Sequence, residues 1–328
     1  MTFSSLIGND SAKAFLQKTA LQVFLFSGPE GVGKKAFALA FTEFLFGEKH
    51  VKKIQKSIHP DFFFFRPEGK TLMHPIASIR TVLEEVARPP FEAPFKVFVI
   101  EDVERMLPTS SNALLKTLEE PPPYVKFVLL TSRFDELLPT IASRCSKVSF
   151  HPIEDEALSK YLVEKKEVSL EKVAQVVLAS QGSFSRAMKL LEALEDPIRF
   201  SFLELLKDSF LLPPSFTFIE SLAKIEKLLE KKSEKEEEGS SLLENMDLLF
   251  EDLLFWVRDL HLLKQTSSKA YLFHQAYFQV LQDQLETRKI PSLEKISRLV
   301  DEARFALQRS SKPRVVLEHL FSKAAGIL

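Results

Sequence analysis

The chain has 328 residues, of which 45% are hydrophobic and 27% charged, a composition typical of a well-packed soluble protein. At about 150 residues per domain, this length predicts about two domains, and three small ones would also fit. Lys and Arg number 44 against 45 Asp and Glu, so the net charge of -1 excludes a chain-wide positive field that would attract nucleic acid or an anionic membrane. The single cysteine excludes a disulfide framework and a four-cysteine zinc module.

The beginning of the chain shows no export or membrane signal. The first residues lack a basic segment followed by an apolar core, and no apolar run approaches the ~18 residues that span a bilayer. We therefore expect a cytoplasmic protein without a membrane partner.

Short apolar runs alternate with helical patterns in the first part of the chain. The runs cover residues 23–26, 62–65, 97–100, 127–130 and 148–150. Nearly continuous apolarity over such lengths is typical of parallel strands covered on both faces, so residues 1–152 are predicted to form a doubly wound α/β domain. Helices are predicted over residues 38–46 and 110–120, the second with Thr109 or Ser110 as its cap and an end at Pro121.

The remainder of the chain is predicted to be entirely helical. Three short amphipathic helices over residues 154–165, 170–179 and 183–194 indicate a small lid domain, 153–196. Helical patterns then continue through a third, all-α domain, 197–328. Residues 224–238 carry balanced Lys and Glu and are predicted to be a solvated helix end or a loop.

A glycine-rich segment follows the first apolar run directly. Residues 28–35 read GPEGVGKK, which contains the spacing G-x-x-x-x-G-K between a predicted strand and a predicted helix. Gly28, Gly31 and Gly33 would let backbone N–H groups surround a phosphate, and Lys34 would add a positive charge. We interpret this segment as a nucleotide-binding phosphate loop, with an ordinary glycine-rich turn as the alternative.

Two positions near this loop differ from those of a working ATPase. After the lysine, a Ser or Thr hydroxyl normally holds magnesium, but this chain has Lys35. The third run ends in Glu101-Asp102, where the usual order is a metal-holding Asp followed by a Glu, and the exchange moves each carboxylate by about 1 Å. We therefore expect little or no ATP hydrolysis, with binding of ATP and magnesium left open. The alternative is a polar cluster at a strand end.

One segment connects the chain to a known family. Residues 111–122, SNALLKTLEEPP, resemble the signature of bacterial clamp-loader subunits within the AAA+ ATPases. Thr131-Ser132 closes the fourth run where that family places its sensor-1 polar residue, with Thr131 as the candidate, and Ser143-Arg144-Cys145 resembles its SRC motif. Arg186 lies in a segment similar to sensor 2, and residues 248–264 resemble the collar helix. The resemblance implies an AAA+ domain, a lid and a collar that joins subunits.

The resemblance also implies a function and partners. The expected partners are the gamma/tau and delta subunits of a DNA polymerase III clamp loader, with the sliding clamp and primed DNA reached through the complex. Lys35 and the order of Glu101 and Asp102 favour a stator-like subunit over the motor subunit. Arg144 would then be an arginine finger supplied to the ATP site of a neighbouring subunit. The alternative for Arg144 is a surface residue paired with an acid.

Other functions remain open from the sequence alone. The chain could be a working AAA+ ATPase, either a clamp-loader motor or a remodelling enzyme, if Lys35 is tolerated. A small P-loop kinase is a third hypothesis, which the long helical C-terminal part disfavours. No second acidic site with the spacing of a polymerase is found, so any polymerase activity would belong to the holoenzyme.

A metal site is not predicted. Several clamp-loader proteins carry a four-cysteine zinc module before the second strand, but this chain has no cysteine there, so we expect no zinc. His50, His59 and His74 lack a regular ligand spacing and are predicted to be surface residues or hydrogen-bonded core residues.

Overall fold

The computed structural model describes residues 3–68, 73–166, 168, 170–194, 196–213, 215–233 and 241–326. It divides into two compact units, Met1–Ala187 and Met188–Leu328, with the division inside helix α9 (Phe184–Ala193). The three-domain boundaries expected from the sequence stay a prediction.

Unit 1 contains a five-stranded sheet in which every strand pair is parallel. Its strands, in the spatial order β2-β3-β4-β1-β5, are β1 (Val23–Ser27), β2 (Phe62–Phe65), β3 (Lys96–Ile100), β4 (Val125–Thr131) and β5 (Ser146–Ser149). In the register of the sheet, Ser27 lies opposite both Thr131 and Ser149. The predicted α/β class and all five strands are confirmed.

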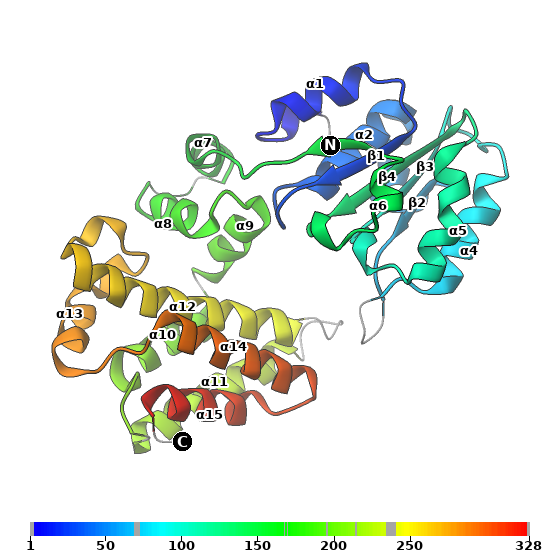
Figure 1. Ribbon diagram of the computed structural model, residues 1–328. Helices are drawn as coiled ribbons and strands as arrows, with labels where there is room; N and C mark the ends of the chain where they lie inside the picture. The colour runs from blue at the N-terminus through cyan, green and yellow to red at the C-terminus, as the bar shows by residue number, and fades with distance from the viewer. Residues whose placement is uncertain are drawn as a thin grey trace. The chain divides into compact units, whose positions relative to one another are not determined.

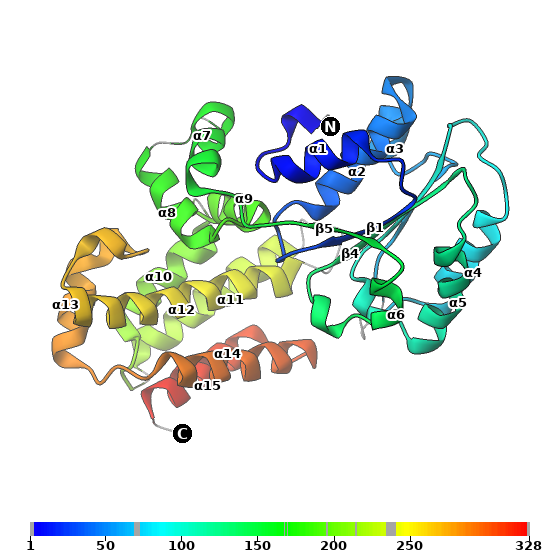
Figure 2. The same ribbon diagram turned by 45° about the horizontal axis from the view of Figure 1, so that its top comes forward.

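Helices cover both faces of this sheet, as Figure 2 shows. The helices α1 (Asp10–Lys18), α2 (Lys34–Phe46) and α3 (Val51–Gln55) pack on one face, around a core rich in phenylalanine. The helices α4 (Ile76–Val86), α5 (Pro108–Glu119) and α6 (Pro139–Ala142) pack on the other. Because helices cover both faces, the three central strands β3, β4 and β1 are buried along their whole length and can be apolar at most positions.

The start of α5 corrects the predicted cap. The N-cap residue is Leu107, Pro108 is the first helical residue, and neither Thr109 nor Ser110 caps the helix. Proline suits this position because its fixed φ matches the helix and its missing N–H would have had no partner there. The end of α5 at Glu119 agrees with the prediction. Helix α2 begins four residues before the predicted residue 38, directly after Gly33.

Three further helices follow the sheet, two within unit 1 and a third that continues from unit 1 into unit 2. The helices α7 (Asp155–Lys166), α8 (Leu170–Ser180) and α9 lie close to the ranges expected from the sequence. Gly182, with φ +74°, makes the turn before α9, and its carbonyl accepts the N–H of Ile153. A side chain at Gly182 would collide with Pro152 and the backbone of Ile153.

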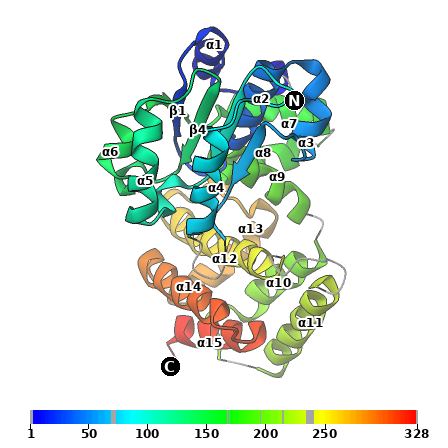
Figure 3. The ribbon, with the colours of Figure 1, turned by 90° about the vertical axis from the view of Figure 1, so that its right-hand side faces the viewer.

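Unit 2 is a helical bundle, whose labelled helices can be followed in Figures 1 and 3. It comprises α10 (Pro197–Ser209), α11 (Phe216–Ser233), α12 (Ser241–Thr266), α13 (Phe278–Thr287), α14 (Leu293–Gln308) and α15 (Pro313–Ala325). Trp256 on α12 is fully buried in its core. The expected all-α C-terminal part is confirmed. Of the segment 224–238, residues 224–233 belong to α11 and the rest lies outside the described residues.

Six short 3₁₀ segments connect these elements: η1 (Phe3–Ser5), η2 (Glu48–His50), η3 (Val103–Arg105), η4 (Phe134–Glu136), η5 (Lys269–Tyr271) and η6 (Gln275–Tyr277). Within the part of the chain that the structure describes, we find no helix with the length and apolarity to cross a membrane.

A buried charged cluster joins three parts of unit 2. Arg199 on α10 donates to both carboxylate oxygens of Asp252 on α12, at 2.7 and 2.9 Å. His274 lies between Asp252 and Asp259, with ring nitrogens 3.4 and 3.2 Å from their oxygens. Asp259 also accepts the backbone N–H groups of Phe273 and His274. The cluster therefore fastens the segment before α13 to the long helix α12.

Candidate functional site

The glycine-rich loop lies where the sequence predicts it, at the carboxyl end of β1 and before α2 (Figure 1). Gly28 lies so close to the end of β5 that a Cβ would be 2.3 Å from the carbonyl oxygen of Phe150. Gly31 and Gly33 have φ of +78° and +98°, which residues with side chains rarely adopt. These three positions require glycine for backbone reasons, whatever the loop binds.

Lys34 is buried and bonded inside the loop itself. Its Nζ donates to the carbonyl oxygens of Gly28 and Pro29, both at 2.6 Å, and to Ser132 Oγ at 2.9 Å. Burial lowers the pKa of Lys34, although nearby carboxylates, Asp102 first, act in the opposite direction. The ammonium group of Lys34 already has three hydrogen-bond acceptors within the protein, and a nucleotide phosphate would compete with them.

Lys35 lies beside the carboxylates that end β3. Its Nζ is 3.7 Å from Glu101 Oε2 and 4.5 Å from the centre of the Phe64 ring. Asp102, the carboxylate that acts most strongly on Lys34, has one carboxylate oxygen 3.6 Å from Arg105 Nε. The structure thus brings Lys35 and Glu101 together, while Asp102 is held in the turn after the strand. A lysine ammonium next to Glu101 supplies one positive charge but cannot coordinate magnesium.

The end of β4 completes this region. Thr131 is fully buried, and its Oγ1 accepts the N–H of Arg133. The hydroxyl that contacts Lys34 belongs to Ser132, the second residue of the predicted sensor-1 pair, and not to the candidate Thr131.

The segment around Ser183 and Ser185, at the start of α9, lies against the glycine-rich loop within unit 1. The N–H of Ser185 donates to the carbonyl oxygen of Gly31 at 3.1 Å. A Cβ at Gly31 would lie 2.0 Å from Ser183 Oγ. Arg186 is in the first turn of α9, and its N–H donates to Ser183 Oγ at 3.3 Å. The predicted sensor-2 segment therefore lies next to the glycine-rich loop, with its serine residues in contact.

Arg144 lies apart from this loop, between α6 and β5. Its Nε donates to Glu119 Oε1 at 2.7 Å, its Nη2 donates to the same oxygen, and its Nη1 donates to the Thr140 carbonyl at 2.8 Å. The side chain of Arg144 is 29% exposed. The SRC segment is thus fixed to the end of α5. Arg144 is paired with an acid, as the alternative interpretation expected, but the sequence did not indicate that this acid is Glu119.

Cys145, the neighbour of Arg144, is not a reactive thiol. Its Sγ donates to the carbonyl oxygen of Ile141 at 3.1 Å, and burial raises its pKa to about 12. A thiol with this pKa stays protonated at neutral pH and is a poor nucleophile.

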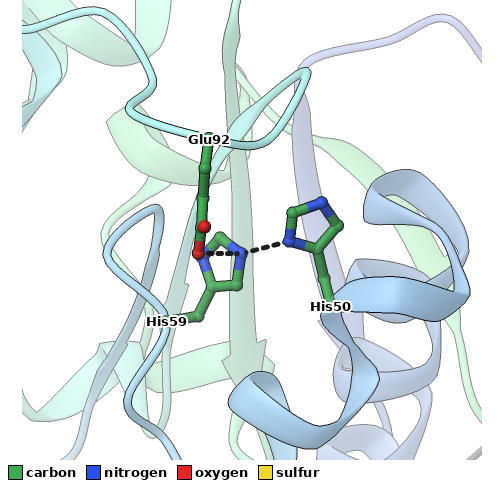
Figure 4. Close-up of side chains that lie close together, drawn as sticks. All are labelled: His50, His59 and Glu92. Carbon is green, nitrogen blue, oxygen red and sulfur yellow. Dashed lines mark hydrogen bonds and ion pairs between the residues drawn. The ribbon is translucent and has the colours of Figure 1, made fainter.

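A second cluster in unit 1 contains His50 and His59, two of the three histidines considered above, together with Glu92 (Figure 4). His50, His59 and Glu92 place their donor atoms within 4.8 Å of one another, a spacing that could hold a metal ion. His59 Nε2 is 2.8 Å from His50 Nδ1 and 3.3 Å from Glu92 Oε1. His74 is elsewhere, with its Nε2 2.7 Å from the Glu101 carbonyl oxygen.

Hydrogen bonds explain this cluster better than a metal does. The N–H of Asp61 donates to His59 Nδ1 at 3.0 Å, so neutral His59 carries its proton on Nε2 and donates it toward His50. A metal at the centre needs the Nε2 lone pair, which would force a proton onto Nδ1 against the Asp61 N–H. Lys53 Nζ also donates to both carboxylate oxygens of Glu92, at 2.6 and 2.8 Å, so this carboxylate already has a cationic partner. Burial lowers the pKa of His59, which keeps the neutral form at pH 7.

We expect metal ions to leave this protein's stability unchanged. An ion present at about 100 times its Kd would add ~2.7 kcal/mol to the free energy of unfolding, a readily detected shift. Thermal unfolding of the full chain should therefore show the same midpoint with EDTA and with added zinc. A midpoint raised by zinc, and no longer raised in a His59→Ala variant, would contradict the hydrogen-bonded arrangement.

Residues 9–154 match the family model described as "DNA polymerase III, delta subunit". Over this region the chain is similar to subunits of the DNA polymerase III clamp loader. The chain is 31% identical over 152 residues to DNA polymerase III subunit delta' of Bacillus subtilis, and this match covers 43% of this chain and 46% of that one. It is also 32% identical over 188 residues to DNA polymerase III subunit gamma of Buchnera aphidicola. This match covers 52% of this chain and 50% of the Buchnera subunit.

A solved structure shares the fold of the chain. It is a DNA polymerase III gamma subunit-related protein from Thermotoga maritima, with a TM-score of 0.52, 19% sequence identity and coverage of 97% of this chain and 98% of that one. Among the curated relatives, this chain spans about half the length of the Buchnera gamma and Bacillus delta' subunits. Subunits named delta' and gamma match about equally well, so the comparisons do not separate these two roles.

Proposed function

We propose that this chain is a delta'-type subunit of a DNA polymerase III clamp loader. It acts as a stator: it does not hydrolyse ATP usefully itself, helps to place the sliding clamp on primed DNA, and lends Arg144 to the ATP site of a neighbouring subunit. Its partners are then the gamma/tau and delta subunits, with the clamp and DNA reached through the complex.

The observation that carries this proposal is the position of Lys35. Where a motor subunit has a hydroxyl for magnesium, this chain has an ammonium group 3.7 Å from Glu101. A divalent cation at the same place would meet a fixed like charge and would compete for that carboxylate. The three internal acceptors of Lys34 support the same conclusion, because an ammonium group that is already hydrogen-bonded within the protein gains less from a phosphate.

The test is calorimetric titration of the full chain with magnesium ATP, together with a steady-state hydrolysis assay. We expect no turnover by the natural protein. A Lys35→Thr variant restores the magnesium-binding hydroxyl and removes the like charge, so its affinity should depend more on magnesium. Lys56→Thr, which removes an exposed lysine outside the loop, serves as the control and should behave like the natural protein. Tight binding with turnover in the natural protein would contradict the stator role.

A second candidate function is that of a gamma-type motor, which the similarity to the Buchnera gamma subunit favours. It requires Lys35 to move away from Glu101 when nucleotide binds. The hydrolysis assay separates the two candidates, since only a motor turns over ATP.

A further inference from the structure

Arg144 is held by acceptors from two different elements. Its Nε and Nη2 donate to one carboxylate oxygen of Glu119, the last residue of α5. Its Nη1 donates to the carbonyl oxygen of Thr140 on α6 at 2.8 Å and lies 3.4 Å from Ser143 Oγ. Three contacts from two sides fix the plane of the guanidinium group.

The same contacts leave part of the guanidinium group available. An arginine has five N–H groups in a planar fork. Glu119 takes the side edge of the fork, formed by Nε and one N–H of Nη2. The second N–H of Nη2, at the outer end, has no acceptor among the described residues. A phosphate oxygen from outside the chain can approach this end without displacing Glu119.

The pair contributes little to the stability of the fold. The side chains of Arg144 and Glu119 are 29% and 47% exposed, and ion pairs with this exposure are weakened by solvent. The main physical effect of Glu119 is to restrict a long, flexible side chain. An arginine that is already ordered loses less conformational freedom when it binds a phosphate.

We propose that Glu119 is a positioning residue, which holds Arg144 ready for the phosphate groups of a nucleotide bound to the neighbouring subunit. The inference rests on the proposed function, because it assumes that Arg144 acts in that site. Glu119 acts through Arg144 and does not touch the nucleotide.

The experiment uses a reconstituted clamp loader that contains this chain and its motor subunits. In a Glu119→Ala complex we expect the single-turnover rate of ATP hydrolysis at the neighbouring site to fall about tenfold, because a misplaced finger slows the chemical step. The nucleotide concentration that gives half of the maximal single-turnover rate should stay nearly unchanged, because nucleotide binding is not altered. Glu119→Gln keeps an acceptor oxygen and should recover part of the rate. Glu120→Ala is the matched control: Glu120 is exposed, and its carboxylate has no partner among the described residues.

The outcomes separate this inference from the function on which it rests. In an Arg144→Ala background, Glu119→Ala should have no further effect, whereas a merely structural role would still lower the rate and the unfolding midpoint. If Arg144→Ala slows hydrolysis and Glu119→Ala does not, the positioning role is wrong and the finger role stands. A faster Glu119→Ala complex would mean that Glu119 withholds Arg144, which also overturns the proposal. If Arg144→Ala has no effect, both fail.

Discussion

Replacing Arg144 by alanine is expected to slow ATP hydrolysis at one neighbouring site of a reconstituted clamp loader by about 10³-fold. The physical reason is that a guanidinium group stabilises the charge that develops on the phosphoryl oxygens in the transition state. Single-turnover hydrolysis measures the effect, because the remaining sites of the complex would mask it in a steady-state assay. The isolated chain should fold normally, since Arg144 loses only a partly exposed ion pair with Glu119 and hydrogen bonds to Thr140 and Ser143 near the surface.

Arg88→Ala is the matched control for this prediction. Arg88 is an exposed arginine of unit 1 that pairs with Glu85 at 2.8 Å, as Arg144 pairs with Glu119. The Arg88→Ala complex should hydrolyse ATP at the natural rate. Equal rates for the Arg144→Ala and natural complexes would overturn the proposed role of Arg144, and equal losses in both variants would indicate a general defect in assembly.

The second large effect is expected in unit 2, at the buried pair of Arg199 and Asp252. Asp252→Ala leaves the guanidinium group of Arg199 buried without its carboxylate, so the free energy of unfolding should fall by about 3–5 kcal/mol. Chemical denaturation followed by fluorescence measures this, because Trp256 is the single tryptophan of the chain and lies in the core of unit 2. Asp301→Asn, at an exposed carboxylate 3.4 Å from Arg304, is the control and should cost less than ~1 kcal/mol. A loss no larger for Asp252→Ala than for the control would contradict the prediction.

The same cluster predicts how stability depends on pH. Burial alone would lower the pKa of His274, but its hydrogen bonds to Asp252 and Asp259 outweigh burial and raise the pKa above its usual value near 6.5. Folding therefore favours protonated His274, and this adds to the free energy of unfolding. The stabilisation is fully present below the pKa of His274 in the unfolded chain, and it is lost as pH rises through the higher pKa of His274 in the folded protein. For Asp252, whose pKa is lowered by His274 and Arg199 against the effect of burial, stability is lost as pH falls through the folded pKa.

The measurement is the Trp256 unfolding transition of the natural protein across pH, beside a His274→Gln variant. Stability should decline on the alkaline side in the natural protein, and this decline should become shallower in the variant. His319→Gln, at a less buried histidine of α15, should keep the natural profile. An unchanged alkaline decline in His274→Gln would show that His274 does not cause it.

Local patterns in the sequence were enough to predict the sheet, most helices and the glycine-rich loop. Each depends on a short window: apolar runs for the strands, and glycine spacing for a loop whose backbone needs positive φ at Gly31 and Gly33. The wrong cap of α5 arose within such a window, where Pro108 determined the start of the helix instead of a hydroxyl side chain. The absence of a hydroxyl at position 35 is equally plain from the sequence.

Only the tertiary structure decided which side chains meet. Glu119 is 25 residues from Arg144, and Arg199 is 53 residues from Asp252, separations at which no periodic pattern relates two positions. Ser132 meets Lys34 because β4 ends beside β1, and this depends on the strand order. The sequence by itself determined the fold class and the candidate residues, since both depend on short-range backbone preferences. The partners of those residues depend on long-range packing, which is decided only when the elements come together.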